Sequence, residues 1–465
     1  MSAATNTAVA RVAEIVGDSN STGNPSELAA YEIDGKRPSA AVRPGSGEEV
    51  AEVIRFAAAE KLGVIAAGAR TKLGIGLPPR KYDLALDMTR LDRVIAYDPD
   101  DLTLGVEAGI PLRKLQGALA ERRQFLPLAV PFFARTTVGG AIASGMDSPL
   151  RQFYGTARDY ILGMEFVTGE GTLAKSGGRV VKNVTGYDLH KLMIGSLGTL
   201  GVMTKLNFRT FPLPIDTRAF VIRFERADQA FDLRARVAHS PLSPITTEIL
   251  SPGAADLFCS DAAGQIERAP LAAGVLINST WAFTAGFAGT EKVLHRCETE
   301  LRRMAEQAGT VGISALGREQ IPGAFGRKRE FVAIALESAP ATTILKLSVL
   351  SSRMKDILRE VEADAGGVSL RWAAMARGVG VIYVVLLPDS RDDRRREHIV
   401  LTANRIQVAC ACAGGHTTIP WCPAEWKHSL RVWGSEGADL EEMRKLKAVF
   451  DPQGILGAGR FVGGI

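Results

Sequence analysis

Glycines crowd a stretch of the chain that otherwise has the apolar pattern of helix and strand. Residues 181–206, "VKNVTGYDLHKLMIGSLGTLGVMTKL", contain Gly186, Gly195, Gly198 and Gly201. Glycine inside a regular element costs about 0.5–1 kcal/mol relative to alanine. Such a cluster indicates backbone that needs positive φ angles or that lies directly against a ligand.

The composition is that of a globular chain with many turns or ligand loops. The 465 residues suffice for two or three domains, and 46% hydrophobic content is enough for a core. The 48 glycines exceed the usual share of about 7% and follow no Gly-x-y period. They therefore indicate turns and ligand loops rather than a fibrous fold.

Charge and cysteine content argue against several classes of protein. A formal charge of +5, from 56 basic and 51 acidic residues without a long basic block, disfavours nucleic acid as a partner. Five cysteines, none before Cys259, and no signal-peptide pattern predict a reduced, cytoplasmic setting. No stretch approaches the ~20 apolar residues of a spanning helix. We expect any membrane association to be peripheral, at the inner face and through partners.

Residues 46–76 predict a helix and a strand that lead into a glycine loop. Apolar residues recur at helical spacing behind Ser46, whose side chain can cap the helix, and "VIAAG" at 64–68 is typical of a buried strand. The loop "GARTKLGIG" follows. Successive N–H groups in such a loop can surround a diphosphate, and Arg70 and Lys72 would add positive charge.

Neither common nucleotide motif accompanies this loop. No G-x-x-x-x-G-K-[ST] occurs, and no G-x-G-x-x-G lies between a strand and a helix. NAD on a Rossmann fold and a P-loop ATPase are therefore poorly supported.

The pattern changes at about residue 214, because "FPLPIDTRAF" brings two prolines and the glycine loops stop. Strand-like and helix-like segments then alternate, which predicts a second sheet domain with helices on one face. We expect strands in "AFVIRF", "LSPITTEIL", "AGVLINSTWA", "LKLSVL", "VSLRW", "VGVIYVVLLP" and "IQVACACA". A short amphipathic helix and a glycine-rich loop follow from residue 436.

Four motifs carry a resemblance to a known family: "GARTKLGIG", "TTVGGAIASG", "YGTARDYILGMEFVTGEG" and "KNVTGYDLHKLMIGSLGTLGVMT". In this order they resemble the FAD-binding domain of the p-cresol methylhydroxylase/vanillyl-alcohol oxidase (PCMH/VAO) type, over residues 40–212. Within that family, with "AGGHTT" and "FDPQGILGAGRF", the chain is most similar to the FAD-binding E subunits of glycolate oxidase (glycolate dehydrogenase). The family's usual ending L-N-P-G-[KR] is replaced here by "LGAGR".

The resemblance implies an α+β fold. A two-part FAD-binding domain of the PCMH/VAO type is followed by an α/β-sheet substrate (cap) domain, and the C-terminal tail returns to the FAD domain. We expect a mobile N-terminal segment (1–37), the FAD-binding domain (38–213), the substrate domain (214–435), and a C-terminal helix and loop that pack on the FAD domain (436–465).

The resemblance also implies which residues hold FAD. The first loop wraps the pyrophosphate, and later turns pass close to the flavin and ribityl chain or border the dinucleotide. The implied FAD-binding residues are Gly68, Ala69, Arg70, Thr71, Lys72, Leu73, Gly74, Thr136, Thr137, Val138, Gly139, Gly140, Ser144, Gly145, Tyr154, Gly155, Gly198, Gly201 and Val202. We expect non-covalent FAD, because Arg70 stands where family members with attached flavin usually carry a histidine.

Groups for the chemistry should come from the second domain. Oxidation of an alcohol by a flavin needs a base for the hydroxyl proton and usually an arginine for a substrate carboxylate. Related D-2-hydroxy-acid dehydrogenases carry a cluster resembling H-x-D-G-N-x-H, which this chain lacks. His416 is the candidate catalytic residue, with a merely hydrogen-bonded loop histidine as the alternative. Arg371 and Arg377 are the candidate carboxylate binders, with surface positions as the alternative.

The cysteines near His416 do not predict a metal site. Cys410, Cys412 and Cys422 have the spacing C-x-C followed by Cys ten residues on, which does not fit the common zinc patterns. In a strand, Cys410 and Cys412 would share a face with ordinary core residues. We expect neither a metal nor an iron–sulfur site.

Three functions remain open. The leading one is an FAD-dependent subunit that oxidises a small 2-hydroxy acid, glycolate or D-lactate, by hydride transfer to flavin N5 and passes the electrons to a partner. The second is an FAD-binding electron-transfer or structural subunit without its own substrate site, and the third is a self-sufficient oxidase that uses O₂. The resembled E subunit implies a second flavin subunit and an iron–sulfur subunit as partners.

Overall fold

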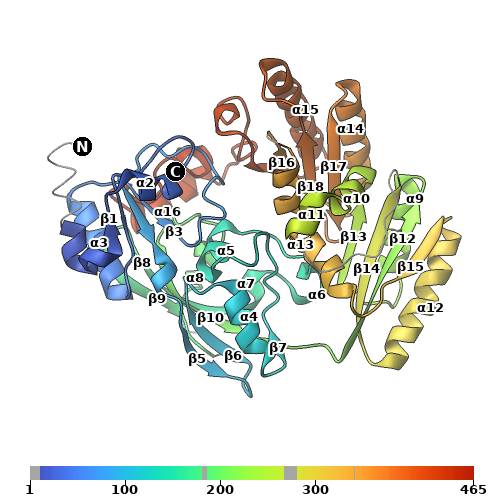
Figure 1. Ribbon diagram of the computed structural model, residues 1–465, viewed down its shortest axis with the longest axis horizontal. Helices are drawn as coiled ribbons and strands as arrows, with labels where there is room; N and C mark the ends of the chain where they lie inside the picture. The colour runs from blue at the N-terminus through green and yellow to red at the C-terminus, as the bar shows by residue number, and fades with distance from the viewer. Residues whose placement is uncertain (1–10, 181–185, 267–279, 340) are drawn as a thin grey trace. The chain divides into compact units, whose positions relative to one another are not determined.

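The computed structural model describes residues 11–180, 186–266, 280–339 and 341–465 (Figure 1). The chain divides into two compact units, which we call unit 1 and unit 2. Unit 1 comprises Met1–Met146, Thr156–Leu213 and Glu436–Ile465, and unit 2 comprises Asp147–Gly155 and Pro214–Ser435. Both units are therefore assembled from separate stretches of sequence.

Residues 147–155 differ from the sequence prediction, which included them in the domain at 38–213. They belong to unit 2. Asp147 forms an ion pair with Arg377, and Thr247 donates a hydrogen bond to Gln152. These partners lie 230 and 95 residues away along the chain. A local sequence pattern carries no information about such partners.

Two sheets form the framework of unit 1. The first has the strand order β1-β2-β4-β3, in which β2, β4 and β3 run parallel, and the second is antiparallel with the order β5-β6-β10-β8-β9. The strands of the first sheet are β1 (Ser21–Thr22), β2 (Ala40–Val42), β3 (Val64–Ala67) and β4 (Leu84–Asp87). Those of the second are β5 (Val94–Asp98), β6 (Thr103–Glu107), β8 (Ile161–Val167), β9 (Leu173–Gly177) and β10 (Val202–Arg209).

Helices and short pieces complete unit 1. The short strands β7 (Gln124–Phe125) and β11 (Phe211–Pro212) pair with each other. The helices are α2 (Pro25–Leu28), α3 (Gly47–Ala59), α4 (Leu112–Ala120), α5 (Val138–Ser144), α7 (Ala157–Tyr160), α8 (His190–Met193) and α16 (Leu440–Phe450). The 3₁₀ turns are η1 (Asp18–Asn20), η2 (Ala29–Tyr31), η3 (Met88–Arg90) and η5 (Val462–Gly464).

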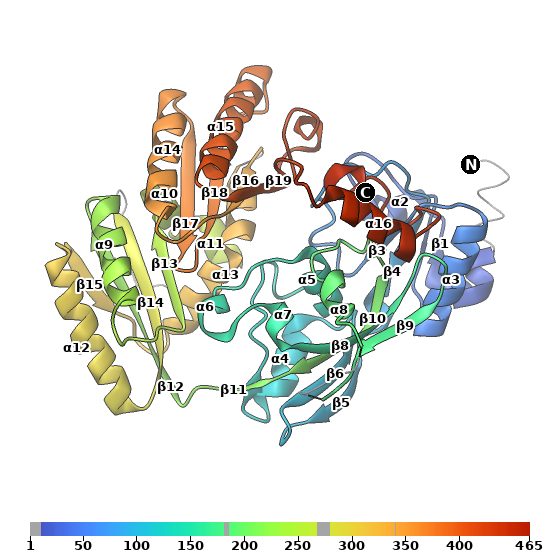
Figure 2. The same cartoon turned by 180° about the vertical axis from the view of Figure 1, so that it is seen from behind.

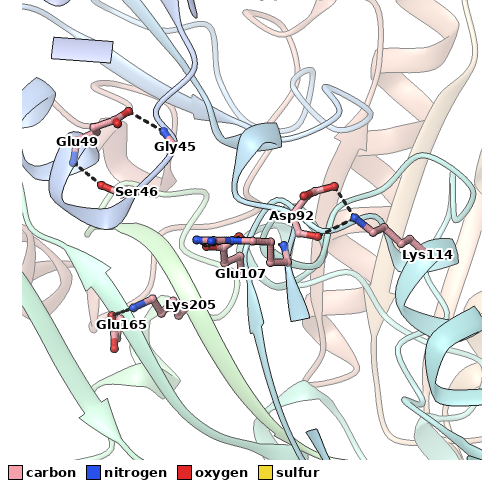
Figure 3. A network of polar contacts seen from close by, with 9 residues as sticks. Gly45, Ser46, Glu49, Asp92, Glu107, Lys114, Glu165 and Lys205 are labelled. Atoms are coloured by element: carbon pink, nitrogen blue, oxygen red, sulfur yellow. Dashed lines mark hydrogen bonds and ion pairs between the residues drawn. The ribbon is translucent and has the colours of Figure 1, made fainter. Parts of the chain in front are cut away.

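The helix predicted behind Ser46 is confirmed as α3. Ser46 Oγ accepts a hydrogen bond from the N–H of Glu49 at 3.1 Å, and Glu49 Oε2 accepts one from the N–H of Gly45 at 2.7 Å (Figure 3). This exchange satisfies N–H groups that have no partner within the helix itself. The apolar face of α3 is buried in the core beside β2, β3 and β4. The cap therefore fixes where the first strand–helix–strand unit begins.

Much of the N-terminal segment predicted to be mobile (1–37) is folded, while residues 1–10 of it lie outside the described residues. From residue 18 onward it forms η1, β1, α2 and η2, and β1 pairs with β2. Leu28, Tyr31 and Ile33 are buried in a small core that also contains Tyr82. Their apolar side chains are spaced too irregularly to give a helix or strand signal, so the polar composition around them dominated the prediction.

Unit 2 is built on an antiparallel sheet of eight strands within the described residues. The order is β15-β12-β14-β13-β17-β18-β16-β19. The strands are β12 (Asp216–Phe224), β13 (Thr246–Leu250), β14 (Trp281–Gly289), β15 (Gly312–Ala315), β16 (Thr343–Ser348), β17 (Arg371–Arg377), β18 (Val381–Leu387) and β19 (His416–Trp421). Of the strand predicted at 273–282, Trp281 and Ala282 belong to β14, and residues 273–279 lie outside the described residues.

The helices of unit 2 lie on both faces of this sheet rather than on one. They are α6 (Arg151–Tyr154), α9 (Ala227–Ala238), α10 (Pro252–Phe258), α11 (Asp261–Ile266), α12 (Glu291–Gln307), α13 (Ile321–Ser338), α14 (Met354–Gly367) and α15 (Asp393–Cys412), with a 3₁₀ turn η4 (Ala424–Trp426). Helices α9, α12, α14 and α15 lie along the sheet and share its apolar core (Figure 2). Helix α13 reaches the opposite face, where Lys328 contacts Glu248.

The pairing register assigns alternate side chains of the sheet to two faces. One face packs on α9, α12, α14 and α15 and is apolar, with residues such as Ile249, Phe283 and Val384. We call the opposite face the polar face. It carries Thr246, Glu248, Thr284, Lys346, Arg371, Arg377, Tyr383 and His416. The sheet thus packs its apolar face on helices and gathers polar groups on the polar face. The polar face is therefore the one on which a site is expected.

The strand predicted at "IQVACACA" is wrong, because residues 406–412 continue helix α15. The buried residues Ile399, Ala403, Ile406 and Cys410 follow each other at helical spacing. A short window around Cys410 and Cys412 gives an apparent alternation, and only the longer window gives the period of 3.6. Cys410 is consequently buried and Cys412 exposed.

The structure bears on membranes in one respect. Of the helices in the described ranges, none has both the length and the apolar character needed to cross a bilayer.

Removing the cap of α3 tests the account of unit 1. Ser46→Ala should lower the free energy of unfolding of unit 1 by about 1 kcal/mol, because the N–H of Glu49 loses its acceptor. Thermal unfolding of unit 1 measures the effect. Ser19→Ala is the matched control, since Ser19 is exposed and its side chain makes no hydrogen bond in the described structure. Equal unfolding of both variants would contradict the assigned cap.

Candidate functional site

Two adjoining hollows in unit 1 are lined by the glycine loops. They share Ala66, Ala67, Gly68, Thr137, Gly140, Ala143 and Leu197. The first hollow is further lined by Ala69, Arg70, Thr71, Lys72, Leu73, Ser144 and Arg460. The second is further lined by Met88, Ala108, Gly139, Gly198, Gly201, Val202 and Met203. Loops far apart in sequence thus meet where the sequence analysis expects one ligand.

The loop after β3 presents backbone N–H groups to the first hollow. Arg70 has a φ of +60°, which turns the chain into a left-handed step. Among the residues that the structure describes, none accepts a hydrogen bond from the N–H of Ala69, Arg70 or Thr71. Successive N–H groups around such a step form a concave anion site. The loop therefore has donors for a phosphate group.

The sequence predicts that Arg70 adds positive charge for a diphosphate. In the structure this charge is already balanced by Asp87. Arg70 Nη1 lies 2.9 Å from Asp87 Oδ2, and its guanidinium stacks 4.7 Å from the centre of the Tyr31 ring. Tyr31 Oη donates to the same carboxylate at 2.6 Å. Burial and this carboxylate raise the pKa of Tyr31 to about 12. Arg70 thus holds the loop to the end of β4.

Lys72 also supports the loop from behind. Its Nζ donates to Thr136 Oγ1 at 2.7 Å and to the carbonyl of Pro131 at 3.1 Å. The side chain is 9% exposed. Thr136, which the resemblance implies to bind FAD, is itself 1% exposed and lines neither hollow. The pair therefore braces the loop, and the loop's backbone faces the hollow.

Helix α5 forms the wall that both hollows share. Thr137 caps this helix by accepting a hydrogen bond from the N–H of Gly140 at 3.2 Å. A Cβ on Gly68 would lie 2.1 Å from Thr137 Oγ1, and one on Gly139 would lie 2.9 Å from the carbonyl oxygen of Ala108. These two glycines are thus required by the close approach of one loop to another. Contact between loops, and not only a ligand, therefore accounts for glycine at these two positions.

The glycines of the stretch at 195–201 form the remaining wall. Gly195 and Gly198 have φ values of +78° and +74°, and Leu197 between them has +53°. A bulky residue in this region is strained, and such residues gather at functional sites. The N–H of Leu197 donates to the carbonyl of Ala143 at 2.9 Å, which ties this loop to α5. Beside Gly198 a Cβ would meet no atom closer than 4.0 Å.

The implied FAD residues fall into three groups. Those that line the hollows are Gly68, Ala69, Arg70, Thr71, Lys72, Leu73, Thr137, Gly139, Gly140, Ser144, Gly198, Gly201 and Val202. Those that lie next to lining residues in the chain are Gly74, Thr136, Val138 and Gly145. Tyr154 and Gly155 belong to unit 2.

Several lining residues were not predicted from the sequence, among them Met88, Leu197 and Met203. Ala66, Ala67, Ala108 and Ala143 are small residues beside recognised glycines, and smallness near such loops was an available signal. Arg460 reaches the first hollow from the far end of the chain. No local pattern could have assigned it.

The polar face of unit 2 gathers charges around Arg377. Arg377 is 4% exposed and ion-pairs with Asp147, which Arg151 also approaches to 3.4 Å. Burial lowers the pKa of Arg377, but Asp147, Tyr383 and Glu248 together outweigh it and raise the pKa. Tyr383 lies with its ring centre 5.2 Å from the guanidinium. The guanidinium is thus held rigidly and stays charged.

Lys346 adds another cation to this cluster. On the pairing register it lies opposite Tyr383, on the polar face. Burial lowers the pKa of Lys346, Asp147 counteracts this, and Arg377 and Arg151 lower the pKa further. Arg377 and Arg151 therefore pair with the single carboxylate of Asp147, and Lys346 is a third basic group whose charge this crowding disfavours. Excess positive charge at a desolvated site favours an anionic ligand.

A second buried pair lies beside this cluster. Lys328 Nζ donates to Glu248 Oε2 at 2.8 Å and to Thr246 Oγ1 at 3.0 Å, and Thr284 Oγ1 also donates to Glu248 Oε2 at 2.8 Å. Glu248 Oε1 is buried without a hydrogen-bond partner among the described residues. Glu248 is the register partner of Arg377. These polar residues were missed because β13 was read only as an apolar strand.

The three candidate catalytic residues are separated by the sheet register. Arg377, Val381, Ser348 and His416 follow one another across β17, β18, β16 and β19 in a single row. Three strand spacings correspond to about 14 Å. Arg371 lies at the opposite end of β17 and is exposed. The structure therefore brings Arg377 and His416 to the same end of the polar face and leaves Arg371 apart.

No group of three or more metal-ligating side chains occurs in the part of the chain that the structure describes. Cys410, on α15, is buried in the core of unit 2, while His416 and Cys412 are exposed.

Two family models match the chain. Residues 38–177 match a model described as an FAD binding domain. Residues 213–417 and 433–461 match a model described as the C-terminal domain of FAD linked oxidases. The FAD expected from the sequence is therefore confirmed as the cofactor.

Known proteins extend the comparison. The glycolate oxidase subunit GlcD of Bacillus subtilis (strain 168) is 23% identical over 425 residues, which are 91% of this chain and 88% of that relative. The glycolate oxidase subunit GlcE of Escherichia coli (strain K12) is 35% identical over 164 residues, which are 35% of this chain and 46% of that relative. The specific likeness to an E subunit thus extends over about a third of the chain.

The solved structure of p-cresol methylhydroxylase with substrate bound confirms the expected fold. It matches with a TM-score of 0.77 and 16% identity, over 99% of this chain and 97% of that one. The α+β fold with a PCMH/VAO-type FAD-binding domain and a second sheet domain is therefore that of this chain.

The residues around the two hollows fit FAD. The N–H groups of Ala69, Arg70 and Thr71 can receive the pyrophosphate, and small residues leave the backbone open along the rest of the wall. The backbone of Gly198 is open on one side, since a Cβ there would meet no described atom closer than 4.0 Å. A dinucleotide that lies against backbone accounts for the many glycines and alanines among the lining residues.

Filling the shared wall should exclude FAD. Ala143 lines both hollows from α5, so Ala143→Phe should place a ring in the cofactor space and lower the flavin content at least tenfold. Ala143→Ser, which adds one atom, should keep the wild-type content. Since we expect non-covalent FAD, acid precipitation should leave the flavin in the supernatant, where absorbance measures it. Normal flavin in Ala143→Phe would refute the placement, and a yellow pellet would refute the non-covalent attachment.

Proposed function

The chain belongs to the FAD-linked oxidases, and from this premise we propose that it is a dehydrogenase subunit that oxidises a small 2-hydroxy acid and passes the electrons to a partner. Glycolate and D-lactate are the proposed substrates. The bound FAD supplies the hydride acceptor, its N5 atom. The observation that carries the proposal is the group of basic residues, Arg377, Arg151 and Lys346, around the single carboxylate of Asp147.

Arg377 is proposed to bind the carboxylate of the substrate. Its guanidinium is held by Asp147 and by the ring of Tyr383, so little conformational entropy would be lost on binding. Lys346 and Arg151 supply charge that Asp147 alone does not balance. A carboxylate entering this cluster would neutralise part of that charge.

His416 is proposed to take the hydroxyl proton. It is exposed at the start of β19, on the same face and in the same row as Arg377. An imidazole can accept a proton near neutral pH and release it to water. The distance of about 14 Å along the row leaves room for a small hydroxy acid together with the side chains that hold it.

A partner is proposed to receive the electrons. Two relatives bear the name of glycolate oxidase subunits, which motivates the proposal that this chain works in a complex. We propose a second flavin subunit and an iron–sulfur subunit as those partners. We further propose that the chain functions in the cytoplasm, with membrane contact only through partners.

One observation favours a second function, an FAD-binding subunit without a substrate site of its own. Asp147 occupies the edge of Arg377 that a substrate carboxylate would use. If that ion pair never opens, the polar face has a structural role, and the FAD serves electron transfer alone.

Anaerobic flavin bleaching separates these functions. The purified chain should lose its flavin absorbance with glycolate or D-lactate, and it should consume little O₂ with either acid. D-2-hydroxyglutarate is a useful third probe, because its second carboxylate tests the excess of cations. Retained absorbance with all three acids would favour the second function, and rapid O₂ turnover by the isolated chain would favour a self-sufficient oxidase.

Two arginines of β17 form a matched pair for the carboxylate site. Arg377→Lys keeps the charge but loses the planar fork, so the substrate concentration for half-maximal bleaching should rise about tenfold, as for a lost charged hydrogen bond. Arg371→Lys, at the exposed end of the same strand, should change it less than about twofold. Flavin content controls for folding. Similar values for both variants would remove Arg377 from the site.

A further inference from the structure

The C-terminal tail of unit 1, defined here as residues 447–460, contacts both walls of the FAD hollows. It begins in the last turn of α16 and ends at Arg460, which lines the first hollow. Lys447 and Arg460 are separated by only a short loop, yet their partners lie in two different glycine loops.

The tail extends the parallel sheet beside β3. The N–H of Val64 donates to the carbonyl of Ile455 at 2.8 Å, and the N–H of Gly457 donates to the carbonyl of Val64 at 2.9 Å. Leu456 forms a parallel bridge with Val64. Because β3 leads directly into the loop at Gly68, the tail pairs with the strand from which this loop starts.

Lys447 holds the loop of the second hollow. Its Nζ donates to the carbonyl of Thr199 at 2.8 Å and to the carbonyl of Leu456 at 2.7 Å, and it lies 2.6 Å from Asp451 Oδ2. Thr199 directly follows Gly198, which lines that hollow. A Cβ on Gly457 would lie 3.1 Å from Thr199 Cγ2, so the tail and this loop are in tight contact.

Asp451 orients the lysine. Besides Lys447, its carboxylate accepts the N–H groups of Ile455 at 3.1 Å and Leu456 at 2.8 Å. The side chain of Asp451 is fully buried. The N–H of Gly169 donates to the carbonyl of Phe450 at 2.8 Å, which ties the start of this turn to the end of β8. The lysine is thus directed by a rigid turn.

Arg460 holds the loop of the first hollow. Its Nη2 donates to the carbonyl of Ile75 at 2.6 Å and to the carbonyl of Leu73. The residue is 4% exposed, and burial lowers its pKa to about 10. The N–H of Leu77 donates back to the carbonyl of Arg460 at 2.9 Å. The loop and the tail therefore exchange hydrogen bonds in both directions.

We propose that the tail positions the FAD site, with Lys447 fixing the loop at Gly198 and Arg460 fixing the loop at Gly68–Leu73. Burying a cation is costly unless directional partners compensate for lost water. Apolar residues would serve better if the tail only filled space. Donors aimed at the carbonyls of two ligand loops instead fix where the N–H groups and glycines of those loops point. The proposal depends on FAD binding and not on the substrate proposed above.

Lys447→Met tests the proposal through FAD affinity. Apoprotein should be reconstituted with FAD, and the dissociation constant read from quenching of flavin fluorescence. We expect it to rise about tenfold or more, as for the loss of a charged donor to the Thr199 carbonyl. Lys445→Met is the matched control on the same helix, because Lys445 is 60% exposed and pairs only with nearby glutamates. Its dissociation constant should stay within about twofold of wild type.

A double variant separates positioning from mere stability. Lys447→Met alone leaves the Asp451 carboxylate buried without its cation, whereas Lys447→Met with Asp451→Asn removes both charges. The double variant should recover much of the lost melting temperature of the apoprotein and still bind FAD weakly, because Thr199 still lacks its donor. Recovery of affinity together with stability would overturn the proposal.

A charge-conserving change decides the matter if Lys447→Met does not fold. Arg460→Lys keeps a cation but is shorter and lacks the fork that reaches two carbonyls. It should weaken FAD at least several-fold at an unchanged melting temperature of the apoprotein. Wild-type affinity in Arg460→Lys or in a folded Lys447→Met variant would show that the tail does not position the site.

Discussion

Backbone N–H groups that have no hydrogen-bond acceptor among the described residues are the constraint on which the glycine loops of unit 1 depend. The loop after β3 leaves the N–H groups of Ala69, Arg70 and Thr71 to a ligand, so its conformation must be held from every other side. Asp87 and Tyr31 hold Arg70, Thr136 and Pro131 hold Lys72, and Thr137 lies against Gly68. The basic side chains of this loop therefore act as anchors. Their charge makes the loop rigid, and the backbone makes it a binding site.

The eight-stranded sheet of unit 2 solves a related problem with side chains. Its helix-covered face contributes the core, so the polar face can carry buried charge without loss of the fold. Arg377 and Glu248 are neighbours across β17 and β13, yet each has its principal partner elsewhere, in Asp147 and Lys328. The Arg377–Asp147 and Lys328–Glu248 ion pairs therefore lie side by side and remain separate.

How much the sequence could predict depends on how far apart the partners lie. The Ser46 cap, the strand at Val64 and the glycine loop are signalled by neighbouring residues, and the structure contains them. Helix α15 was misassigned at Cys410 because a short window resembles alternation. Asp147 was assigned to the wrong unit, and Arg460 was missed, because their partners lie hundreds of residues away. Spacing reports local geometry, whereas ion pairs between distant segments are set by the packed fold.

The discontinuity of unit 1 has a consequence for how the protein is made. Leu73 and Arg460 are 387 residues apart, and the whole eight-stranded sheet of unit 2 is synthesised between them. On the ribosome, domains generally fold in the order in which they emerge. Unit 2 can thus be complete while the first glycine loops still lack their last supports. Cofactor capture would then be a late event in biosynthesis, and a flavin-loaded chain would be one whose synthesis has passed Arg460.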